Sequence, residues 1–428
     1  MSDPKPFQQA AVEAALAAFA DTSGLRRFLV ADEVGLGKTV VAKEVARRMS
    51  HDGQKPLIIY YIANGHAVSH QNKGRVVGFL DKKSRLAAAS TPDRLSLIAV
   101  AARPDTPVLI YALTPGTSFP GSRARLTSGR KEERAYLKVL LERAYPAFAR
   151  NLDPAILRLN VGDSWGSLVQ QAEEKLATPP PHLTQRFREA LATVFGEPVR
   201  ERMDQELRGD PASKKKALTP TAFVGKLRRA LALATLRHQP PDLVILDEFQ
   251  RYRQILDDRD ADPLLAALLN PPASTKRPAI LLLSATPYRL LSTRWEESQG
   301  VLAHAELLEL VGFLAGDGAR TRAKDLFARF GDKLRDIAAH VDGDHPDREA
   351  EIIEAGEIRD ALRALLTPVI SRTERDSVAS VDVLAATSFL DAKPSAEDFR
   401  VYRHLVESFE EDGNYALPYW SSVPLPAQ

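Results

Sequence analysis

The stretch FLVADEVGLGKT, residues 28–39, decides the fold of this chain. Its first three residues are apolar and predict a short buried strand. The run Thr39–Met49 predicts an amphipathic helix, because Val41, Val45 and Met49 recur four residues apart. A glycine-bearing turn between a strand and a helix brings backbone N–H groups together at a helix N-terminus, where they attract an anion. The stretch therefore predicts a phosphate-binding loop within an α/β sheet.

Each residue of the turn has an expected role in such a loop. The backbone N–H groups would come from Val34, Gly35, Leu36 and Gly37. Lys38 would reach the β- and γ-phosphates of a nucleotide, and Thr39 would offer its hydroxyl to Mg²⁺. The strict pattern has glycine where this chain has Asp32. A glycine-rich turn followed by an exposed lysine is therefore the alternative interpretation.

Four further apolar runs predict buried strands: Leu57–Ile62, Val108–Leu113, Leu243–Leu246 and Ile280–Leu283. Helix-like patterns lie between the first predicted strands, and this alternation is typical of an α/β fold with a parallel sheet. Between residues 114 and 235 strand signals are weak and helical patterns prevail. We therefore expect the sheet to be built from residues 1–113 and 236–292, with a mainly helical insertion at 114–235 and a helical extension at 293–428.

The strand Leu243–Leu246 ends in two carboxylates, Asp247 and Glu248. An aspartate at the end of a buried strand near a phosphate loop is suited to hold Mg²⁺ through its water shell. Glu248 would orient, or take a proton from, an attacking water. An exposed acidic turn after a strand is the alternative.

The strand Leu281–Leu283 is followed by the hydroxyl residues Ser284 and Thr286. These side chains could hydrogen-bond the acidic pair and so sense the terminal phosphate. Simple capping of the strand end is the alternative.

In this order the blocks resemble the first RecA-like lobe of superfamily 2 helicases and Swi/Snf-type translocases. Residues 32–39 resemble motif I, including the aspartate in its first position. Asp247-Glu248-Phe249-Gln250 resembles motif II, with Gln250 where histidine or aspartate is usual, and Ser284-Ala285-Thr286 matches motif III. Pro6-Phe7-Gln8 resembles the upstream glutamine motif.

The resemblance implies a RecA-like P-loop NTPase fold with ATP and Mg²⁺ as cofactors. It implies an ATP hydrolase that couples hydrolysis to movement on nucleic acid, with DNA as the expected partner. Gln8 would lie near the adenine edge, and Gln250 with Ser284 and Thr286 would couple the two activities.

Nucleic acid would lie against loops that follow two of the strands. Asn64 and Lys73 come after the second strand, where motif Ia is expected, and Thr114-Pro115-Gly116-Thr117 resembles motif Ib. Thr114 and Gly116 are thus candidate backbone contacts, although Pro-Gly is also ordinary turn chemistry. Residues 73–103 hold seven basic and two acidic residues. Such basic stretches fit contact with a phosphate backbone, and also fit a solvated helix surface.

The resemblance also implies a second lobe that carries an arginine finger. We find no motif for it in the 142 residues after Thr286. We therefore expect slow hydrolysis by this chain alone and a second lobe or another protein partner in trans.

The composition limits the remaining classes of protein. The chain has 428 residues, no cysteine and a formal net charge of +2. Disulfides, cysteine-ligated zinc and iron–sulfur clusters are excluded. No secretory signal or membrane span is recognisable, so we expect a cytoplasmic protein. A non-motor protein that uses ATP as a switch to bind a partner remains the alternative function, and no acid–lysine set supports a nuclease.

Overall fold

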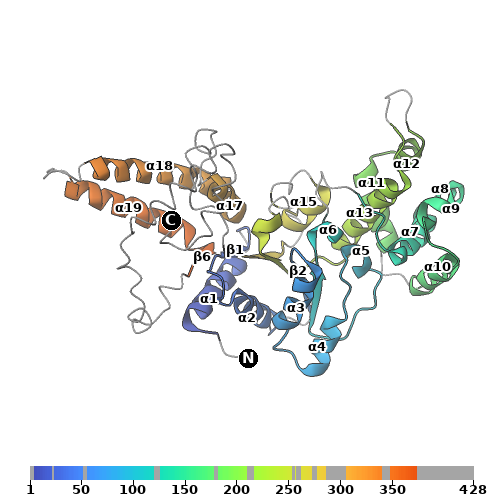
Figure 1. The fold of residues 1–428 in the computed structure, drawn as a ribbon, viewed down its shortest axis with the longest axis horizontal. Helices are drawn as coiled ribbons and strands as arrows, with labels where there is room; N and C mark the ends of the chain where they lie inside the picture. Colours follow the sequence, from blue (N-terminus) through green and yellow to red (C-terminus); the bar gives the residue numbers. More distant parts are fainter. Residues whose placement is uncertain are drawn as a thin grey trace, which may run out of the picture. The chain divides into compact units, whose positions relative to one another are not determined.

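Six parallel strands form a single sheet in the computed structural model, in the order β3-β2-β4-β5-β1-β6 (Figure 1). The strands are β1 (Arg27–Val30), β2 (Leu57–Ile62), β3 (Val108–Leu113), β4 (Leu243–Asp247), β5 (Ala279–Leu283) and β6 (Ile370–Ser371). All five strands predicted from the apolar runs are present. The α/β class with one parallel sheet is therefore confirmed.

The description covers residues 4–21, 24–51, 55–119, 126–177, 182–209, 216–252, 256, 262–271, 277–285, 305–339 and 348–373. Residues 1–373 form one compact unit. Thr286 and residues 374–428 lie outside the described residues. Within the described part of the chain, no helix combines the length and the apolar character needed to cross a membrane.

The sheet is buried on both faces because successive side chains of each strand point to opposite sides. In β1, Phe28 and Val30 belong to one hydrophobic cluster, whereas Leu29 belongs to the other. The adjacent tyrosines of β2 divide in the same way: Tyr61 joins the first cluster and Tyr60 the second. This alternation produces three layers, helices–sheet–helices.

Helices from the first third of the chain cover the face that carries Phe28. They are α1 (Pro6–Ala20), α2 (Lys38–His51), α3 (His66–Val76) and α4 (Lys82–Ala89). Each contributes side chains to the same cluster, among them Val12 of α1, Val45 of α2, Val76 of α3 and Ala88 of α4. Helix α2, which follows the glycine-bearing loop 31–37, thus packs directly on the sheet.

The hydrophobic cluster on the opposite face continues into helices that lie between β3 and β4, with α5 preceding them. They are α5 (Leu95–Ile98), α6 (Pro115–Ser118), α7 (Lys131–Ala144), α8 (Pro146–Asn151), α9 (Pro154–Arg158), α10 (Ser164–Lys175), α11 (Leu183–Phe195), α12 (Val199–Arg208) and α13 (Pro220–His238). Figure 1 shows α7 to α13 as a group of helices in green. One cluster joins them to the strands, so the described part of the insertion shares its core with the sheet.

Helix α13 is the centre of this layer. It is buried almost all round, from Phe223 to Leu236, and packs against α5, α7, α11 and α15 (Pro263–Leu269). A helix with buried side chains nearly all round must be covered nearly all round. The neighbouring helices therefore complete the burial of α13.

The later part of the chain returns to the sheet. Helices α17 (Ala305–Ala315), α18 (Asp317–Ala339) and α19 (Arg348–Leu366) pack together through small apolar clusters. After α19, β6 pairs with β1. The sequence predicted mostly helix for this extension. Two residues are too few to show a strand pattern in the sequence. β6 forms because the edge of β1 that does not pair with β5 hydrogen-bonds to it.

A buried carboxylate ties three helices of the insertion layer together. Glu133 of α7 is fully buried. Its Oε1 accepts hydrogen bonds from Arg228 Nε of α13 at 3.0 Å and from the hydroxyl of Ser96 in α5. Its Oε2 accepts from the backbone N–H of Arg130 at 2.7 Å and from Arg94 Nη1 at 3.2 Å. Each oxygen of the Glu133 carboxylate thus accepts two hydrogen bonds, and the carboxylate is a counter-ion for both Arg94 and Arg228.

We predict that Glu133→Ala lowers the free energy of unfolding by about 3–5 kcal/mol, because the buried charge of Arg228 and the partly buried charge of Arg94 would lose this carboxylate. Glu142→Ala on the same helix is the control, since the partly exposed Glu142–Lys138 pair contributes only about 0.3–0.5 kcal/mol. Urea unfolding of both variants measures the difference. Equal losses would contradict the role given to Glu133.

Candidate functional site

Three sequence motifs meet at one edge of the sheet. In a parallel sheet all carboxyl ends of the strands lie at the same edge, and β4, β5 and β1 are neighbours there. The backbone N–H of Glu248 donates to Leu283 O at 2.9 Å, and that of Ser284 donates to Val30 O at 3.1 Å. The acidic pair, Ser284 and the loop 31–39 are therefore joined by hydrogen bonds between adjacent strands.

The loop has the backbone conformation that its glycines allow. Gly35 and Gly37 have φ angles of 87° and 85°, in the left-handed region that favours glycine. A Cβ at Gly37 would also lie 2.5 Å from Gln8 Nε2. Gln8 is buried, donates to Leu36 O at 2.7 Å and accepts from the backbone N–H of Lys5 at 2.8 Å. Gln8 thus supports the loop from α1.

Asp32, which stands where the strict loop pattern has glycine, connects the loop to the end of β6. Its buried Oδ1 accepts from the backbone N–H of Thr373 at 2.9 Å. The ladder continues on both sides, with Ala31 N–H donating to Ser371 O at 2.7 Å and Glu33 N–H to Thr373 O at 3.1 Å. Burial raises the pKa of Asp32, and the hydrogen bonds from Thr373 oppose that rise. The departure from the pattern therefore has a structural role.

Lys38 is the first residue of α2, and its ammonium turns back over the loop. Nζ donates to Asp32 O at 2.9 Å and to Glu33 O at 3.4 Å. Partial burial lowers the pKa of Lys38, whereas the negative charges of Glu248, Asp32 and Asp247 raise it. A single lysine of the loop is therefore within electrostatic reach of both carboxylates that follow β4.

Asp247 is held by two side chains from the neighbouring strand and helix. Its Oδ2 accepts from Asn72 Nδ2 of α3 at 3.0 Å and from the hydroxyl of Tyr61 in β2. Burial raises the pKa of Asp247. The two hydrogen bonds and Lys38 lower it, and the adjacent Glu248 raises it further. The net rise in the pKa of Asp247 means that its neighbours compensate the negative charge only in part. A bound cation would stabilise the ionised carboxylate.

Glu248 has a strained backbone. Its φ of 53° lies in the left-handed region, which is uncommon for a residue with a side chain. Gln250 Nε2 donates to Glu248 Oε2 at 2.5 Å, and Arg251 Nε lies 4.0 Å from the same oxygen. Backbone strain of this kind concentrates at functional positions. The hydrogen bond from Gln250 orients the Glu248 carboxylate, which the sequence predicted to act on water.

The remaining loop residues differ in their exposure. Val34 is 67% exposed and Gly35 is exposed, so the outer side of the loop faces solvent. Thr39 is the second residue of α2 and is partly exposed. Ser284 is fully buried at the end of β5. An anion could approach the loop from outside, whereas Ser284 can act only through its protein neighbours.

Two predicted nucleic-acid contacts lie side by side further along the same edge. β2 and β3 are paired so that Ile62 faces Leu113, which brings the loops after them together. Asn64 and Gly116 are exposed. Thr114 is buried, and its hydroxyl lies 2.8 Å from the hydroxyl of Thr117. Thr114 therefore shapes the turn after β3, Gly116 is exposed in that turn, and Asn64 is exposed in the loop after β2.

Lys73 is placed differently from the prediction of a phosphate contact. Its side chain is 1% exposed, and Nζ donates to Ala89 O at 3.0 Å and to Thr91 Oγ1 at 2.6 Å. Burial lowers the pKa of Lys73 to about 8. The prediction is wrong for the described conformation, because the ammonium already fastens α3 to the segment after α4 and does not reach the surface.

Three residues hold the acids Asp247 and Asp32 in a way that the sequence did not predict. Tyr61 and Asn72 position Asp247, and Thr373 holds Asp32. Tyr61 carried a usable signal, because a tyrosine within a buried apolar strand needs a partner for its hydroxyl. Thr373 carried none, since 341 residues separate it from Asp32.

We predict that Asp247→Asn stabilises the ligand-free chain by about 0.5–2 kcal/mol at neutral pH, a gain usual when functional strain is removed. The raised pKa in the folded state means that the ionised carboxylate costs stability at neutral pH. That cost disappears as the pH falls through the raised pKa towards the ordinary value of 3.8. Thermal unfolding of both proteins over this pH range measures the gain, which should shrink in acid. A less stable variant at neutral pH would contradict the assignment.

Comparison of this chain with protein-family models, with curated proteins and with solved structures finds no match. The function is therefore argued from the residues at the carboxyl edge of the sheet: the loop 31–39, the pair Asp247–Glu248 and the side chains that hold them.

Proposed function

We propose that this chain is the ATP-binding lobe of a nucleic-acid-dependent ATPase, of the DNA helicase or translocase type, with a RecA-like P-loop fold. The observation that carries the proposal is the convergence of the loop 31–39, after β1, and the pair Asp247–Glu248, after β4, at one edge of the sheet, where only β5 separates the two strands. Lys38 is within electrostatic reach of both acids. A parallel sheet with a ligand site outside the carboxyl ends of its strands supports the same interpretation.

The proposed roles follow from the chemistry of each side chain. The backbone N–H groups of residues 34–37 and the start of α2 would bind phosphate oxygens. Lys38 would exchange the carbonyl oxygens of Asp32 and Glu33 for phosphate oxygens. Asp247 and Thr39 offer the hard oxygen donors that suit Mg²⁺, which would neutralise phosphate charge when bound. Glu248, oriented by Gln250, would position the attacking water.

The coupling residues proposed from the resemblance have a physical route between them. Gln250 donates to Glu248, and the backbone of Glu248 donates to β5 directly before Ser284. A change at the water-positioning carboxylate would therefore reach the end of β5. Thr286 remains a candidate from the sequence. Gln8, placed near adenine by the resemblance, would transmit a base contact to the loop through Leu36 O.

We predict that Lys38→Ala weakens Mg-ATP binding by about 10–100-fold, the equivalent of about 1.5–3 kcal/mol for a lost charged hydrogen bond. Lys43→Ala on the same helix is the matched control and should bind as the original chain does. Titration calorimetry with a non-hydrolysable ATP analogue and Mg²⁺ measures both. Unchanged affinity in Lys38→Ala would count against the loop assignment.

We also predict that Gly116→Asp weakens binding of duplex DNA about fivefold, because a carboxylate near a phosphate in water costs about 1 kcal/mol. Among the described residues, no atom beyond the chain neighbours and backbone of α6 lies within 4 Å of a Cβ at Gly116, so both Gly116→Asp and Gly116→Ala should fold. Gly162 is equally open and lies in the helical insertion, so Gly162→Asp is the charge control.

Fluorescence anisotropy at two salt concentrations measures this DNA binding, which should weaken with salt. The control variants, Gly116→Ala and Gly162→Asp, should bind as the original chain does. Nucleotide binding without any affinity for DNA would instead favour the alternative, a non-motor switch that gates a protein partner.

A further inference from the structure

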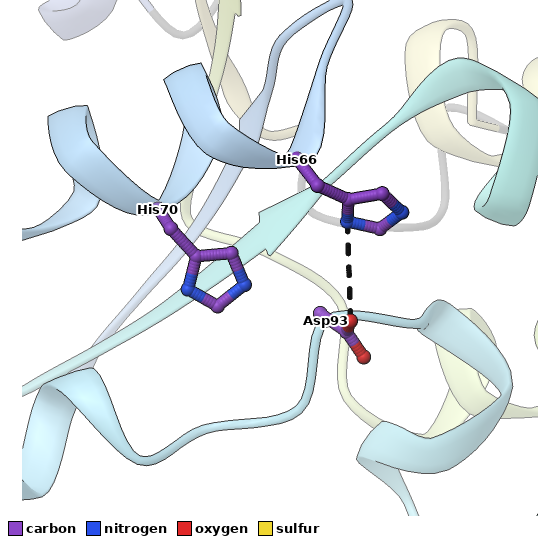
Figure 2. Close-up of side chains that lie close together, drawn as sticks. All are labelled: His66, His70 and Asp93. Atoms are coloured by element: carbon purple, nitrogen blue, oxygen red, sulfur yellow. Dashed lines mark ion pairs between the residues drawn. The ribbon is translucent and has the colours of Figure 1, made fainter.

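A second cluster of chemically active side chains lies beside α3, outside the proposed nucleotide site. Among the described residues, His66, His70 and Asp93 form one group of metal-ligating side chains. Their candidate ligand atoms all lie within 4.8 Å of one another. Figure 2 shows the two imidazoles extending from the helix towards the carboxylate, with the ion pair between His66 and Asp93 dashed.

The spacing of the histidines explains why they meet. His66 and His70 are four residues apart in α3, so their side chains lie on one face of the helix. Asp93 belongs to the segment 90–94 between α4 and α5. His66 Nδ1 lies 3.9 Å from Asp93 Oδ2. Two ligands thus come from one helix and the third from a separate segment, an arrangement that zinc sites use.

The distances are close to those of a bound ion. With bonds of about 2.0–2.1 Å, two ligand atoms of a tetrahedral zinc ion lie roughly 3.3 Å apart. The ligand atoms here need to approach by no more than about 1.5 Å, which rotation of exposed imidazoles provides. Both histidines are exposed, so rotation is not opposed by packing. The backbones of α3 and of the segment 90–94 already place the three side chains close together.

We propose that His66, His70 and Asp93 bind a zinc-class divalent ion, with a fourth coordination position left for water. Imidazole nitrogen suits Zn²⁺, Ni²⁺ and Cu²⁺, whereas Mg²⁺ and Ca²⁺ prefer oxygen ligands. Two imidazoles with one carboxylate are one of the three-ligand sets known for open zinc sites. The ligands are distinct from Asp247 and Thr39, so the site does not depend on the proposed function.

Arg130 limits the affinity of the proposed site for a metal ion. Its Nη2 donates to Asp93 Oδ2 at 2.8 Å, so the carboxylate already has one cationic partner. That bond fixes the direction of the carboxylate, as outer partners of metal ligands do. A bound ion would share the carboxylate with this guanidinium, and repulsion between the two cations opposes tight binding.

The ion would act on the helix that serves the nucleotide site. Lys73, one turn further along α3, already bonds to Thr91 in the segment that carries Asp93. An ion at His66 and His70 would fasten the first turns of α3 to the same segment. Asn72 of α3 donates to Asp247. The proposed ion would therefore stabilise the position of a helix that orients the candidate magnesium ligand.

Titration calorimetry of the full 428-residue chain with Zn²⁺, and separately with Mg²⁺ in the absence of nucleotide, tests the proposal. We expect Zn²⁺ binding that is about tenfold or more weaker in His70→Gln and in His66→Gln, with no comparable response to Mg²⁺. His238→Gln is the matched control, because it removes an imidazole from α13 and should leave Zn²⁺ binding unchanged.

Thermal unfolding provides a second readout on the same proteins. Zn²⁺ should raise the melting temperature of the original chain and of His238→Gln by more than that of His70→Gln, because a ligand stabilises only the state that binds it. Ions bound elsewhere in the chain would be retained in all variants. Equal Zn²⁺ affinity in His66→Gln, His70→Gln and the original chain would overturn the proposal, as would absence of Zn²⁺ binding.

Discussion

The hydrogen bonding of the parallel strands β4, β5 and β1 is the constraint on which the site depends. Parallel pairing forces all three strands to end at the same edge, so residues more than 200 positions apart, Lys38 and Asp247, enter one electrostatic environment. The backbone of Glu248 bonds to β5, and that of Ser284 bonds to β1. Any loss of register between these strands would displace the acidic pair from the loop. The fold thus determines the site through its backbone before any side chain contributes.

The charged groups at this edge carry a cost in the folded chain. Burial raises the pKa values of Asp32 and Asp247 and lowers that of Lys38, so each charged form is disfavoured in the folded chain. Tyr61 and Asn72 compensate Asp247 only in part. Glu248 adds a left-handed backbone. The apolar burial on both faces of the sheet stabilises the fold enough to tolerate these unfavourable charges and the strained backbone. A bound polyanion with a divalent cation would offset several of these unfavourable terms together.

The fold was predictable from the sequence to a large extent. Five apolar runs of three to six residues are too short for helices, and each became a strand. The helical insertion was recognisable from its lack of strand patterns, but its packing was not. Burial of α13 on every side depends on partners from α5, α7, α11 and α15, which no local pattern connects. Lys73 shows the same limit, because its burial is decided by the segment after α4.

The sequence by itself determined the strands, the glycine loop and the acidic pair, because each is a local pattern with a direct physical cause: apolar runs, glycine at positive φ and carboxylates at a strand end. Only the tertiary structure decided which side chains hold them. Asp32 is bound by Thr373, Asp247 by Tyr61 and Asn72, and His70 faces Asp93. These pairs are far apart in the chain, and a polar side chain does not encode its partner. The partner is chosen by which backbones the packed sheet and helices bring within hydrogen-bonding distance.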